Sequence, residues 1–428
     1  MNGRRILFSL TAILFAGTAF GANFYVATNG NDGGTGSSTL PWATLQHAVE
    51  NIGPGDVILV RAGTYKGVRI ENSGLASSGK TLRVDTGAHV ILSAPGPKNK
   101  HNSILEVENF SATVGYWTID GFEIANSPKY GVDIRVTQSI TVQNCTVHNS
   151  ALTGIFTAFS NHPTIQSNLS YSNGEHGIYH SNSGDYPTIV GNQIHNNVSA
   201  GIHMNGDLSE GGDGIISFAT VEKNIVWENG TSGGSGINCD GVDNSLFSNN
   251  LLYSNHASGI SLYAIDGAHG SSNNKVYNNT IVMAADGRFA INIPKSPKGK
   301  ADPIGNQIVN NILYTYSTSN VRGSEIIYTA KPSGFVSDYN VLVNRMSDDN
   351  DNTVISLATW RQKTGQDVHS VISDAATLFV DPTHNNFRLK AGSPAINAGT
   401  LLSQVPDDIL GVKRPQGGLY DIGCYESF

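Results

Sequence analysis

The chain has little charge, little cysteine and no long apolar run beyond its first twenty residues. Asp, Glu, Lys and Arg make up 14% of the 428 residues, and the formal net charge is −8. This balance excludes a nucleic-acid partner, because phosphate contacts need clustered Lys and Arg. Only three cysteines are present, so disulfides are not the main support of the fold. No later segment is apolar enough to predict a membrane span.

The N-terminus is the exception, because its pattern predicts an export signal. Arg4 and Arg5 give a basic start, an apolar run follows, and Ala19 and Gly21 fit the small residues of a cleavage site. We expect residues 1–21 to be removed and the mature protein to be secreted, either extracellular or periplasmic. We expect a monomer with no membrane attachment after this cleavage.

Glycine is abundant, with 48 residues, and much of it stands in a repeated Gly-hydrophobic pair that opens a short strand pattern. The glycines of these pairs lie at positions 131, 154, 177, 201, 236 and 259, and residues 289–293 are a degenerate seventh copy. The spacings are 23, 23, 24, 35 and 23 residues. Fixed periods of this length indicate stacked repeats, and they are too short for propeller blades.

Asparagine recurs between the glycine pairs. It lies at positions 144, 168, 192, 224, 250, 279 and 311, each time before alternating apolar residues. An amide at one turn position can hydrogen-bond the turns above and below it. Each unit holds two or three short strands and covers too little apolar surface to fold alone. The sequence therefore predicts an all-β, right-handed parallel β-helix, a solenoid with an N-terminal cap helix and a short C-terminal helical insertion.

We expect the following organisation: a signal peptide (1–21), an N-terminal cap with the first rungs (22–110), β-helix rungs (111–345), and a C-terminal insertion with closing rungs (346–428). Helical spacing predicts the cap helix at 42–49 and the inserted helix at 356–363, ended by Gly365. Cys145 and Cys239 are four rungs apart, or roughly 19 Å. That separation excludes a disulfide between them, so we predict buried thiols.

Both ends of the chain carry motifs of a known family. Tyr25, Val26, Gly30 and Asp32 form Tyr-Val-x-x-x-Gly-x-Asp, and residues 41–65 hold Pro-Trp-x-Thr-Leu-x-x-Ala and Pro-Gly-Asp-x-Ile with Gly-Thr-Tyr. The closing segments 389–396 and 421–426 add to the match. These ends resemble secreted, polysaccharide lyase-like β-helix proteins that act on carbohydrates. The resemblance implies an extracellular polysaccharide as the partner, with lyases the commonest members and epimerases and hydrolases beside them.

Strand alternation predicts which side chains point outward from the sheet that the glycine pairs form. One outward column holds Asp133, Phe156, Tyr179, His203, Asn238, Ser261 and Asn292, and a second holds Arg135, Ala158, Ser181, Asn205, Asp240, Tyr263 and Pro294. His176, His256 and Arg288 stand near the leading edge of the strands. Aromatic rings stack on sugar faces, and amides and carboxylates bind hydroxyls, so this face is a candidate saccharide groove. The alternative is a solvated sheet face that is polar for no further reason.

Substrate-binding candidates on this face are Arg135, Tyr179, His176, Asn205, Asn238, His256, Arg288 and Asn292. An insertion at 206–214 follows His203 and Asn205, and long loops on a rigid scaffold often carry function. Its Asp207 and Asp213, together with Asp240, are candidate Ca²⁺ ligands, and the sequence indicates no cofactor other than Ca²⁺. A plain flexible loop is the alternative.

Cleavage of a uronic-acid polymer by β-elimination needs an offset for the carboxylate charge, a base for the C5 proton and an acid for the leaving oxygen. His203 is the candidate base, Tyr263 the candidate acid, and Asp240 a third catalytic candidate. The resemblance implies a Lys or Arg base, but Lys223 and Lys275 are the only lysines between 136 and 287. Both stand beside the asparagine strands rather than on the groove.

We predict a polysaccharide lyase, with three alternatives. A glycoside hydrolase is one, since residues 238–243 resemble the Asn-x-Asp-Gly-x-Asp segment of polygalacturonases, although their other motifs are absent. A C5-epimerase would share the first proton abstraction, but the Asp-Pro-His motif of the alginate enzymes is missing. A non-catalytic, adhesin-like saccharide-binding protein is the third.

Overall fold

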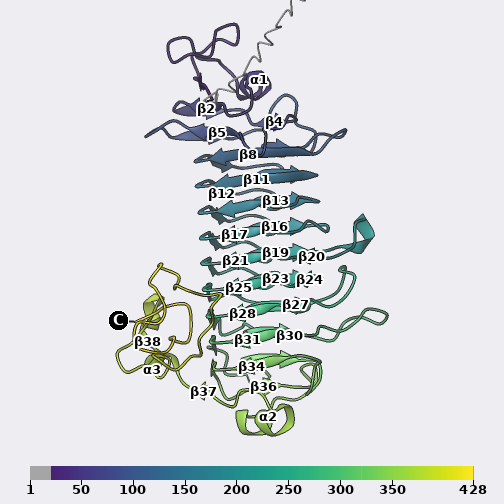
Figure 1. Ribbon diagram of the computed structural model, residues 1–428, viewed down its shortest axis with the longest axis vertical. Helices are drawn as coiled ribbons and strands as arrows, with labels where there is room; N and C mark the ends of the chain where they lie inside the picture. The colour runs from purple at the N-terminus through teal and green to yellow at the C-terminus, as the bar shows by residue number, and fades with distance from the viewer. Residues whose placement is uncertain (1–20, 320, 428) are drawn as a thin grey trace, which may run out of the picture.

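The computed structural model describes residues 21–319 and 321–427, which form a tall stack of short strands (Figure 1). Residues 1–20 of the predicted signal peptide lie outside this description. Nearly all strands belong to three long parallel sheets that run the length of the stack. The prediction of an all-β solenoid is thus confirmed. No helix in the described ranges is both long and apolar enough to span a bilayer.

Sheet 1, which contains the glycine pairs, has eleven strands in the order β36 (Met346–Ser347), β33 (Glu325–Ile327), β30 (Ile291–Ile293), β27 (Ile260–Tyr263), β23 (Ile237–Asp240), β19 (Ile202–Asn205), β16 (Ile178–Ser181), β13 (Ile155–Ala158), β10 (Val132–Arg135), β7 (Leu105–Val107) and β4 (Val68–Ile70).

Sheet 2 has twelve strands in the order β1 (Asn23–Val26), β2 (Val57–Val60), β5 (Lys80–Val84), β8 (Val114–Asp120), β11 (Thr137–Gln143), β14 (Thr164–Gln166), β17 (Thr188–Val190), β21 (Thr220–Glu222), β25 (Leu246–Ser248), β28 (Lys275–Tyr277), β31 (Gln307–Val309) and β34 (Val336–Asp338).

Sheet 3 also has twelve strands, in the order β3 (Gly63–Tyr65), β6 (Val90–Leu92), β9 (Glu123–Ala125), β12 (Thr146–His148), β15 (Leu169–Tyr171), β18 (Gln193–His195), β22 (Ile225–Trp227), β26 (Leu251–Tyr253), β29 (Thr280–Met283), β32 (Ile312–Thr315), β35 (Val341–Leu342) and β37 (Val371–Ile372).

The remaining elements are two small strand pairs, β20 (Ile216–Ser217) with β24 (Val242–Asp243) and β38 (Phe379–Asp381) with β39 (Asn386–Leu389), the α-helices α1 (Leu45–Asn51), α2 (Leu357–Thr364) and α3 (Ala375–Leu378), and the 3-10 turns η1 (Leu208–Glu210) and η2 (Pro382–His384).

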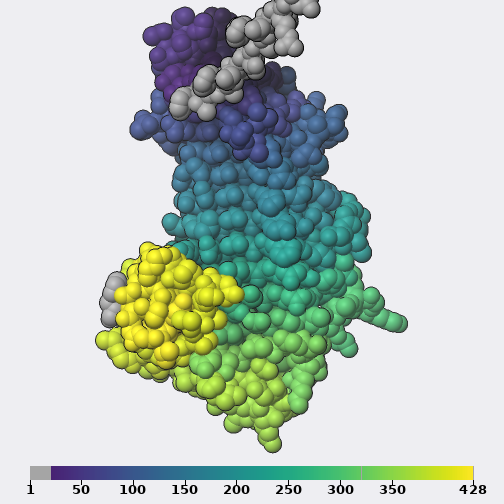
Figure 2. All heavy atoms as spheres, viewed as in Figure 1, coloured from purple at the N-terminus to yellow at the C-terminus, as the bar shows by residue number. Residues whose placement is uncertain are grey.

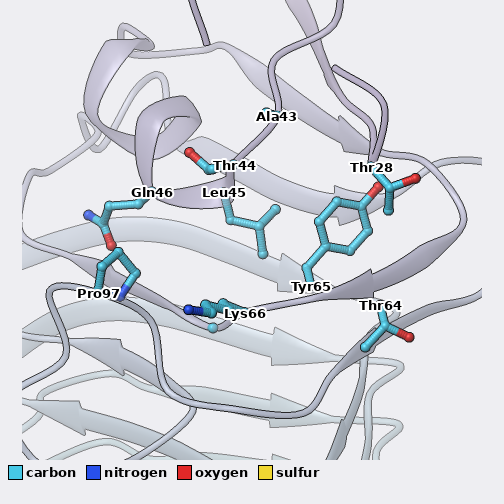
Figure 3. A pocket seen from close by; sticks show the side chains of 10 residues that line it. Thr28, Ala43, Thr44, Leu45, Gln46, Thr64, Tyr65, Lys66 and Pro97 are labelled. Carbon is cyan, nitrogen blue, oxygen red and sulfur yellow. The ribbon is translucent and has the colours of Figure 1, made fainter. Parts of the chain in front are cut away.

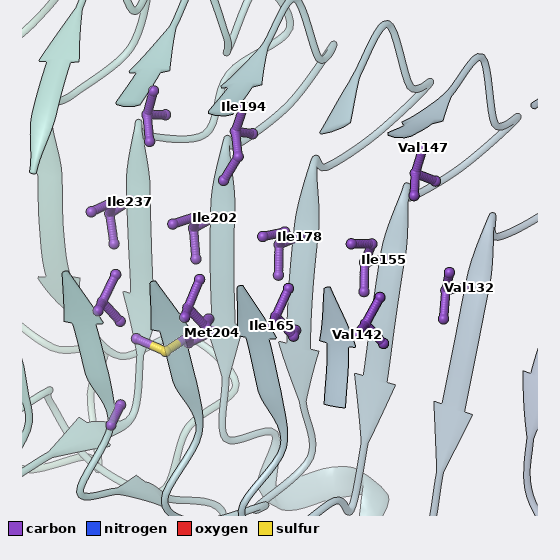
Figure 4. Close-up of a cluster of buried hydrophobic side chains, with 14 of the residues drawn as sticks. Val132, Val142, Val147, Ile155, Ile165, Ile178, Ile194, Ile202, Met204 and Ile237 are labelled. Atoms are coloured by element: carbon purple, nitrogen blue, oxygen red, sulfur yellow. The ribbon is translucent and has the colours of Figure 1, made fainter. Parts of the chain in front are cut away.

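The strands of sheet 1 stack in the register that the glycine spacing predicts. The hydrophobic residues of the pairs, Val132, Ile155, Ile178, Ile202, Ile237 and Ile260, are successive partners across the sheet. They are fully buried and line the interior in a single row (Figure 4). A shift of one residue would turn every side chain to the opposite face, so this row fixes which residues point outward.

The repeated glycine has a steric cause. A Cβ atom added at Gly201 would lie 2.4 Å from Val226 Cγ1 and 2.8 Å from the carbonyl oxygen of Gly236. Real Cβ atoms do not approach other atoms this closely. The pair therefore recurs because the turn from sheet 3 back to sheet 1 leaves no room for a side chain.

Two long asparagine ladders run along the stack, and a short third one joins Asn274 and Asn306, whereas the sequence predicted one. In the first ladder, which extends from Asn168 to Asn340, each Oδ1 accepts the backbone N–H of the rung before it. The prediction was wrong for Asn144, because Cys145 occupies the ladder position and Asn144 takes a left-handed φ of 53° in the turn before it. The second ladder joins Asn173, Asn197, Asn229 and Asn255 in the turn between sheets 3 and 1.

Both predicted helices are present. The cap helix α1 begins after Thr44, whose side chain accepts the backbone N–H of His47. Helix α2 begins after Ser356 and ends at Gly365, which adopts a left-handed φ of 76°. The three cysteines are free and buried, as the rung spacing predicted for Cys145 and Cys239.

The C-terminal segment packs against one side of the lower stack, where Figure 2 shows it in yellow. Phe387 of this segment contacts Tyr253 of sheet 3, with ring centroids 5.3 Å apart. Arg414 donates hydrogen bonds to Asn249 Oδ1 and to Glu426, and both charged side chains of this ion pair are fully buried. The segment therefore covers part of sheet 3 and leaves sheet 1 free of it.

One buried carboxyl should make stability depend on pH. Glu325 occupies an inward position of β33, where its Oε1 accepts a hydrogen bond from Ser337 and its Oε2 has no partner. Burial raises the pKa of Glu325 well above its usual range. A raised pKa means that stability is lost as the pH rises from the unfolded value of about 4.3 through the folded value.

We expect Glu325→Gln, which keeps the shape and removes the ionisation, to raise the free energy of unfolding at pH 8 by about 2 kcal/mol and to leave it nearly unchanged at pH 4. Denaturant unfolding at the two pH values measures this. An equal change at both values would contradict the assignment.

Candidate active site

The candidate site is a cavity of about 270 Å³ on the outer face of sheet 1, in its C-terminal half. Strands β23, β27 and β30 form its floor. Its walls include Asn238, Ser261, Tyr263, Arg288 and Asn292. The register places Asn238, Ser261 and Asn292 directly above one another, as alternation predicted. Four of the predicted site residues, Asn238, Tyr263, Arg288 and Asn292, are thus brought together.

The phenol of Tyr263 is the reactive oxygen of this cavity. Asn238 Nδ2 donates a hydrogen bond to Tyr263 Oη over 2.6 Å. Burial, with a smaller contribution from the charge of Asp240, raises the pKa of Tyr263. The phenol is therefore protonated at neutral pH. Because it accepts the bond from Asn238, its own proton is free to be donated.

The rest of the cavity offers hydroxyl, amide and guanidinium groups. The hydroxyl oxygens of Ser235 and Ser261 lie 2.7 Å apart, and Asn292 Nδ2 donates to Ser261 over 3.1 Å. The Arg288 side chain is exposed, and no carboxylate of the described residues forms an ion pair with it. A free cation beside hydrogen-bonding groups suits a saccharide that carries a carboxylate.

His203 has a different environment from the one a general base requires. Its ring stacks on Tyr179 at 4.6 Å, and its Nδ1 lies 3.2 Å from His176 Nε2. The backbone N–H of Ala200 donates to His176 Nδ1, so neutral His176 carries its hydrogen on Nε2 and donates to His203 Nδ1. The hydrogen of His203 is then on Nε2, which is buried and has no partner among the described groups.

Burial also lowers the pKa of His203 well below 6.5 and that of His176 to about 4. Neutral His203 therefore has no free lone pair to take a proton. The contacts argue against the predicted role as base, and His203 serves instead to pack Tyr179.

Asp240 is also engaged elsewhere. Its Oδ1 accepts the backbone N–H groups of Ile265 and Gly267, and its Oδ2 accepts that of Asp266. The side chain is almost fully buried. The predicted catalytic Asp240 is thus the anchor of the 265–267 loop, and its carboxylate does not face the cavity as a free acid or base.

The candidate Ca²⁺ ligands do not form a site. Asp207 Oδ1 accepts hydrogen bonds from Ser209, and Asp213 Oδ1 accepts the backbone N–H of Ile215, so each carboxylate closes its own turn. In residues 21–319 and 321–427, no three His, Cys, Asp or Glu side chains are grouped to hold a metal. With Asp240 engaged as well, this donor set does not fit Ca²⁺.

Three other predicted residues lie outside the cavity. Arg135 pairs with Asp133 over 2.7 Å, five rungs from Tyr263, which is roughly 24 Å along the stack. His256 pairs with Asp286 at the leading edge. Asn205 bonds Tyr179 and Asp266 in the rungs above the cavity. These residues, with His176 and Tyr179, stay predictions for a longer groove.

Lys300 and Asp266 were not among the residues predicted from the sequence. Both line a second hollow of about 360 Å³, together with Asp207, next to the first. The two hollows share Ile265. Lys300 lies in a loop after residues 289–293, the last copy of the repeat, so strand alternation makes no prediction for it.

A separate cavity of about 480 Å³ lies beneath the cap helix, lined by Leu45, Tyr65, Lys66 and Pro97 among others (Figure 3). It is at the N-terminal end of the stack, several rungs from the site. No candidate residue lines it.

The fold and the site together define a parallel β-helix solenoid with a polar, ligand-sized cavity on the outer face of one sheet. The sequence pattern described as "Pel9A-like, right handed beta helix region" matches residues 24–286. The chain therefore belongs to the Pel9A-like right-handed β-helix family. This confirms the predicted fold and the resemblance.

Relatives include "Pectate lyase PEL9" of Emericella nidulans, 25% identical over 61% of this chain and 74% of that protein. "Pectate lyase L" of Dickeya dadantii is 22% identical over 94% of this chain and 90% of that protein. The solved structure of pectate lyase Pel9A covers 96% of this chain and 98% of its own, with a TM-score of 0.62 and 17% identity. At this identity the structural likeness shows the fold alone.

Proposed function

We propose that the protein is a secreted polysaccharide lyase that cleaves an anionic, uronic-acid polysaccharide by β-elimination in the cavity of Tyr263. The observation that carries the proposal is the convergence of Tyr263, Asn238 and the free cation Arg288 on one saccharide-sized hollow. Two relatives named as pectate lyases support the class of reaction. A retaining or inverting hydrolase would need two free carboxyl groups, and Asp240 is engaged by three backbone N–H groups.

In the proposed reaction, Arg288 binds the uronate carboxylate and offsets the charge that develops when C5 loses its proton. Asn292 and Ser261 bind hydroxyl groups of the same sugar. Since His203 lacks a free lone pair, we assign both proton transfers to Tyr263. Its phenolate form takes the C5 proton, the C4–O bond breaks as the C4=C5 double bond forms, and the phenol returns the proton to the leaving oxygen. The phenolate is thereby regenerated.

Calcium has no step in this scheme, because the carboxylates predicted to hold it are used as turn acceptors. The charge offset falls to Arg288 instead. The phenolate is the scarce form, because burial raises the pKa of Tyr263. The N–H of Asn238 acts in the opposite direction, because its hydrogen bond to Tyr263 Oη stabilises the phenolate.

The experiment for this proposal is Arg288→Ala, assayed on polygalacturonate and alginate by the ultraviolet absorbance of unsaturated products. We expect kcat/KM to fall about 10- to 100-fold, because a charge-assisted hydrogen bond to the substrate carboxylate is lost. The control is Arg388→Ala, which removes an exposed arginine of the C-terminal segment. Equal activity of the two variants would contradict the role of Arg288.

A further inference from the structure

A lysine-bearing arm stands beside the cavity. Residues 294–302, which we name the arm, follow β30 and project from the body of the stack (Figure 1). The same green segment stands out as a finger in the space-filling view (Figure 2). Its tip residues Pro297, Lys298 and Gly299 are exposed, as is Lys295 nearer the base. No step of the proposed reaction uses a residue of the arm.

The arm is held in one shape by its own hydrogen bonds. Ser296 donates its backbone N–H to Asp302 Oδ1 and its hydroxyl to the carbonyl of Ala301, each over 2.8 Å. The backbone N–H of Lys300 donates to the carbonyl of Pro297 over 3.1 Å. The prolines at 294 and 297 restrict the backbone further. A preorganised loop loses less entropy when it binds a ligand than a flexible loop does.

The arm is also anchored to the wall of the site. Lys300 Nζ donates to the carbonyl oxygens of Ile265 and Gly267, over 2.5 and 2.6 Å. Those two residues belong to the loop that Asp240 holds from below. Asp240, the 265–267 loop and Lys300 therefore form one continuous support. It fixes the arm relative to the cavity, since Pro294 lines the cavity and Lys300 lines the hollow next to it.

The charge of the arm is opposite to that of the protein. Its nine residues hold three lysines and one aspartate, a net charge of +2 within a chain of net charge −8. Lys300 is used as the anchor. Lys295 and Lys298 are exposed, and in the described part of the chain no carboxylate forms an ion pair with either, so both ammonium groups are available to a partner. A protein of negative charge repels a polyanion on average, and a local cationic patch reverses that effect at one place.

We infer that the arm is an extended binding site for the anionic polysaccharide, in which Lys295 and Lys298 bind carboxylates of sugar units beyond the one in the cavity. The inference rests on the proposed function, and it means that the polymer extends from the cavity along the arm. Long chains reach both the cavity and the arm, whereas a short oligomer fills the cavity alone. The arm therefore selects polymer over oligomer and speeds encounter at low ionic strength.

The test compares Lys295→Ala/Lys298→Ala with the wild type, using affinity electrophoresis through gels that contain polygalacturonate or alginate. The control is Lys66→Ala/Lys390→Ala, which removes two exposed lysines of the cap and of the C-terminal segment and so matches the change in net charge. We expect the arm variant to bind at least one polymer about tenfold more weakly than the wild type and the control. The difference should shrink as salt is raised, because exposed charges are screened.

Turnover on trigalacturonate, beside polymer turnover, separates the two proposals. The arm variant should lose kcat/KM on polymer and keep it on the trimer. If polymer binding depends on the arm but the wild type cleaves no polymer, the lyase proposal is refuted and the inference about the arm is supported. Equal binding by the arm variant and the control, or no binding of either polymer by the wild type, would overturn the inference.

Discussion

Tyr263→Phe should lower kcat by about 10³- to 10⁴-fold, with little change in KM. Proton transfer by a positioned side chain contributes about 10²- to 10⁴-fold, and the proposed scheme assigns both transfers to this one phenol. The substitution removes a single oxygen and leaves the ring in place beside Asn238. The rate of unsaturated product formation at saturating polygalacturonate measures the effect.

Tyr253→Phe is the matched control, since it removes a phenol from sheet 3 outside the cavity. It should keep the activity of the wild type. The pH profile gives an independent check. Because the pKa of Tyr263 is raised, the phenolate is a small fraction at neutral pH and grows about tenfold per pH unit below that pKa. The wild-type kcat/KM should rise steadily from pH 7 into the alkaline range, and a fall over that range would refute Tyr263 as the base.

Asn224→Ala should destabilise the fold by about 4 kcal/mol or more. Its Oδ1 accepts the backbone and side-chain N–H groups of Asn192, and its Nδ2 donates to the carbonyl of Ile189 and to Asn250. These four hydrogen bonds join Asn224 to three residues of the stack, and a buried polar group left without its partner costs about 1–3 kcal/mol. Because each rung of a solenoid is stabilised by its neighbours, the rungs before and after Asn224 should then unfold in two separate steps.

Denaturant unfolding followed by circular dichroism measures this loss. The control is Gln193→Ala, an exposed residue of the adjacent rung, which should change stability by less than about 0.5 kcal/mol. A similar small change for Asn224→Ala would show that the ladder does not support the stack.

The repeat made most of the architecture predictable from the sequence alone. Each glycine pair places one apolar residue inside, and alternation then assigns the next side chain outside, so the column of Asn238, Ser261 and Asn292 was predictable. The second asparagine ladder was also within reach of the sequence. Asn173, Asn197, Asn229 and Asn255 each lie five residues after a member of the first ladder.

The roles of individual side chains were less predictable, because they depend on turns that the repeat does not describe. Asp240 has the outward position that alternation predicted, but the 265–267 loop of the next rung folds over it and supplies three N–H donors. His203 likewise has the predicted place, while the backbone of Ala200 decides, through His176, which nitrogen carries the hydrogen. Strand periodicity carries no information about either contact.

Mass spectrometry of the products from polygalacturonate and alginate tests the central claim most directly. We predict fragments with one unsaturated sugar end and no gain of water per cleavage. These fragments should be absent when the substrates are incubated with the Tyr263→Phe variant. Fragments that each gain one water molecule, or an intact polymer after exhaustive incubation with both substrates, would contradict it.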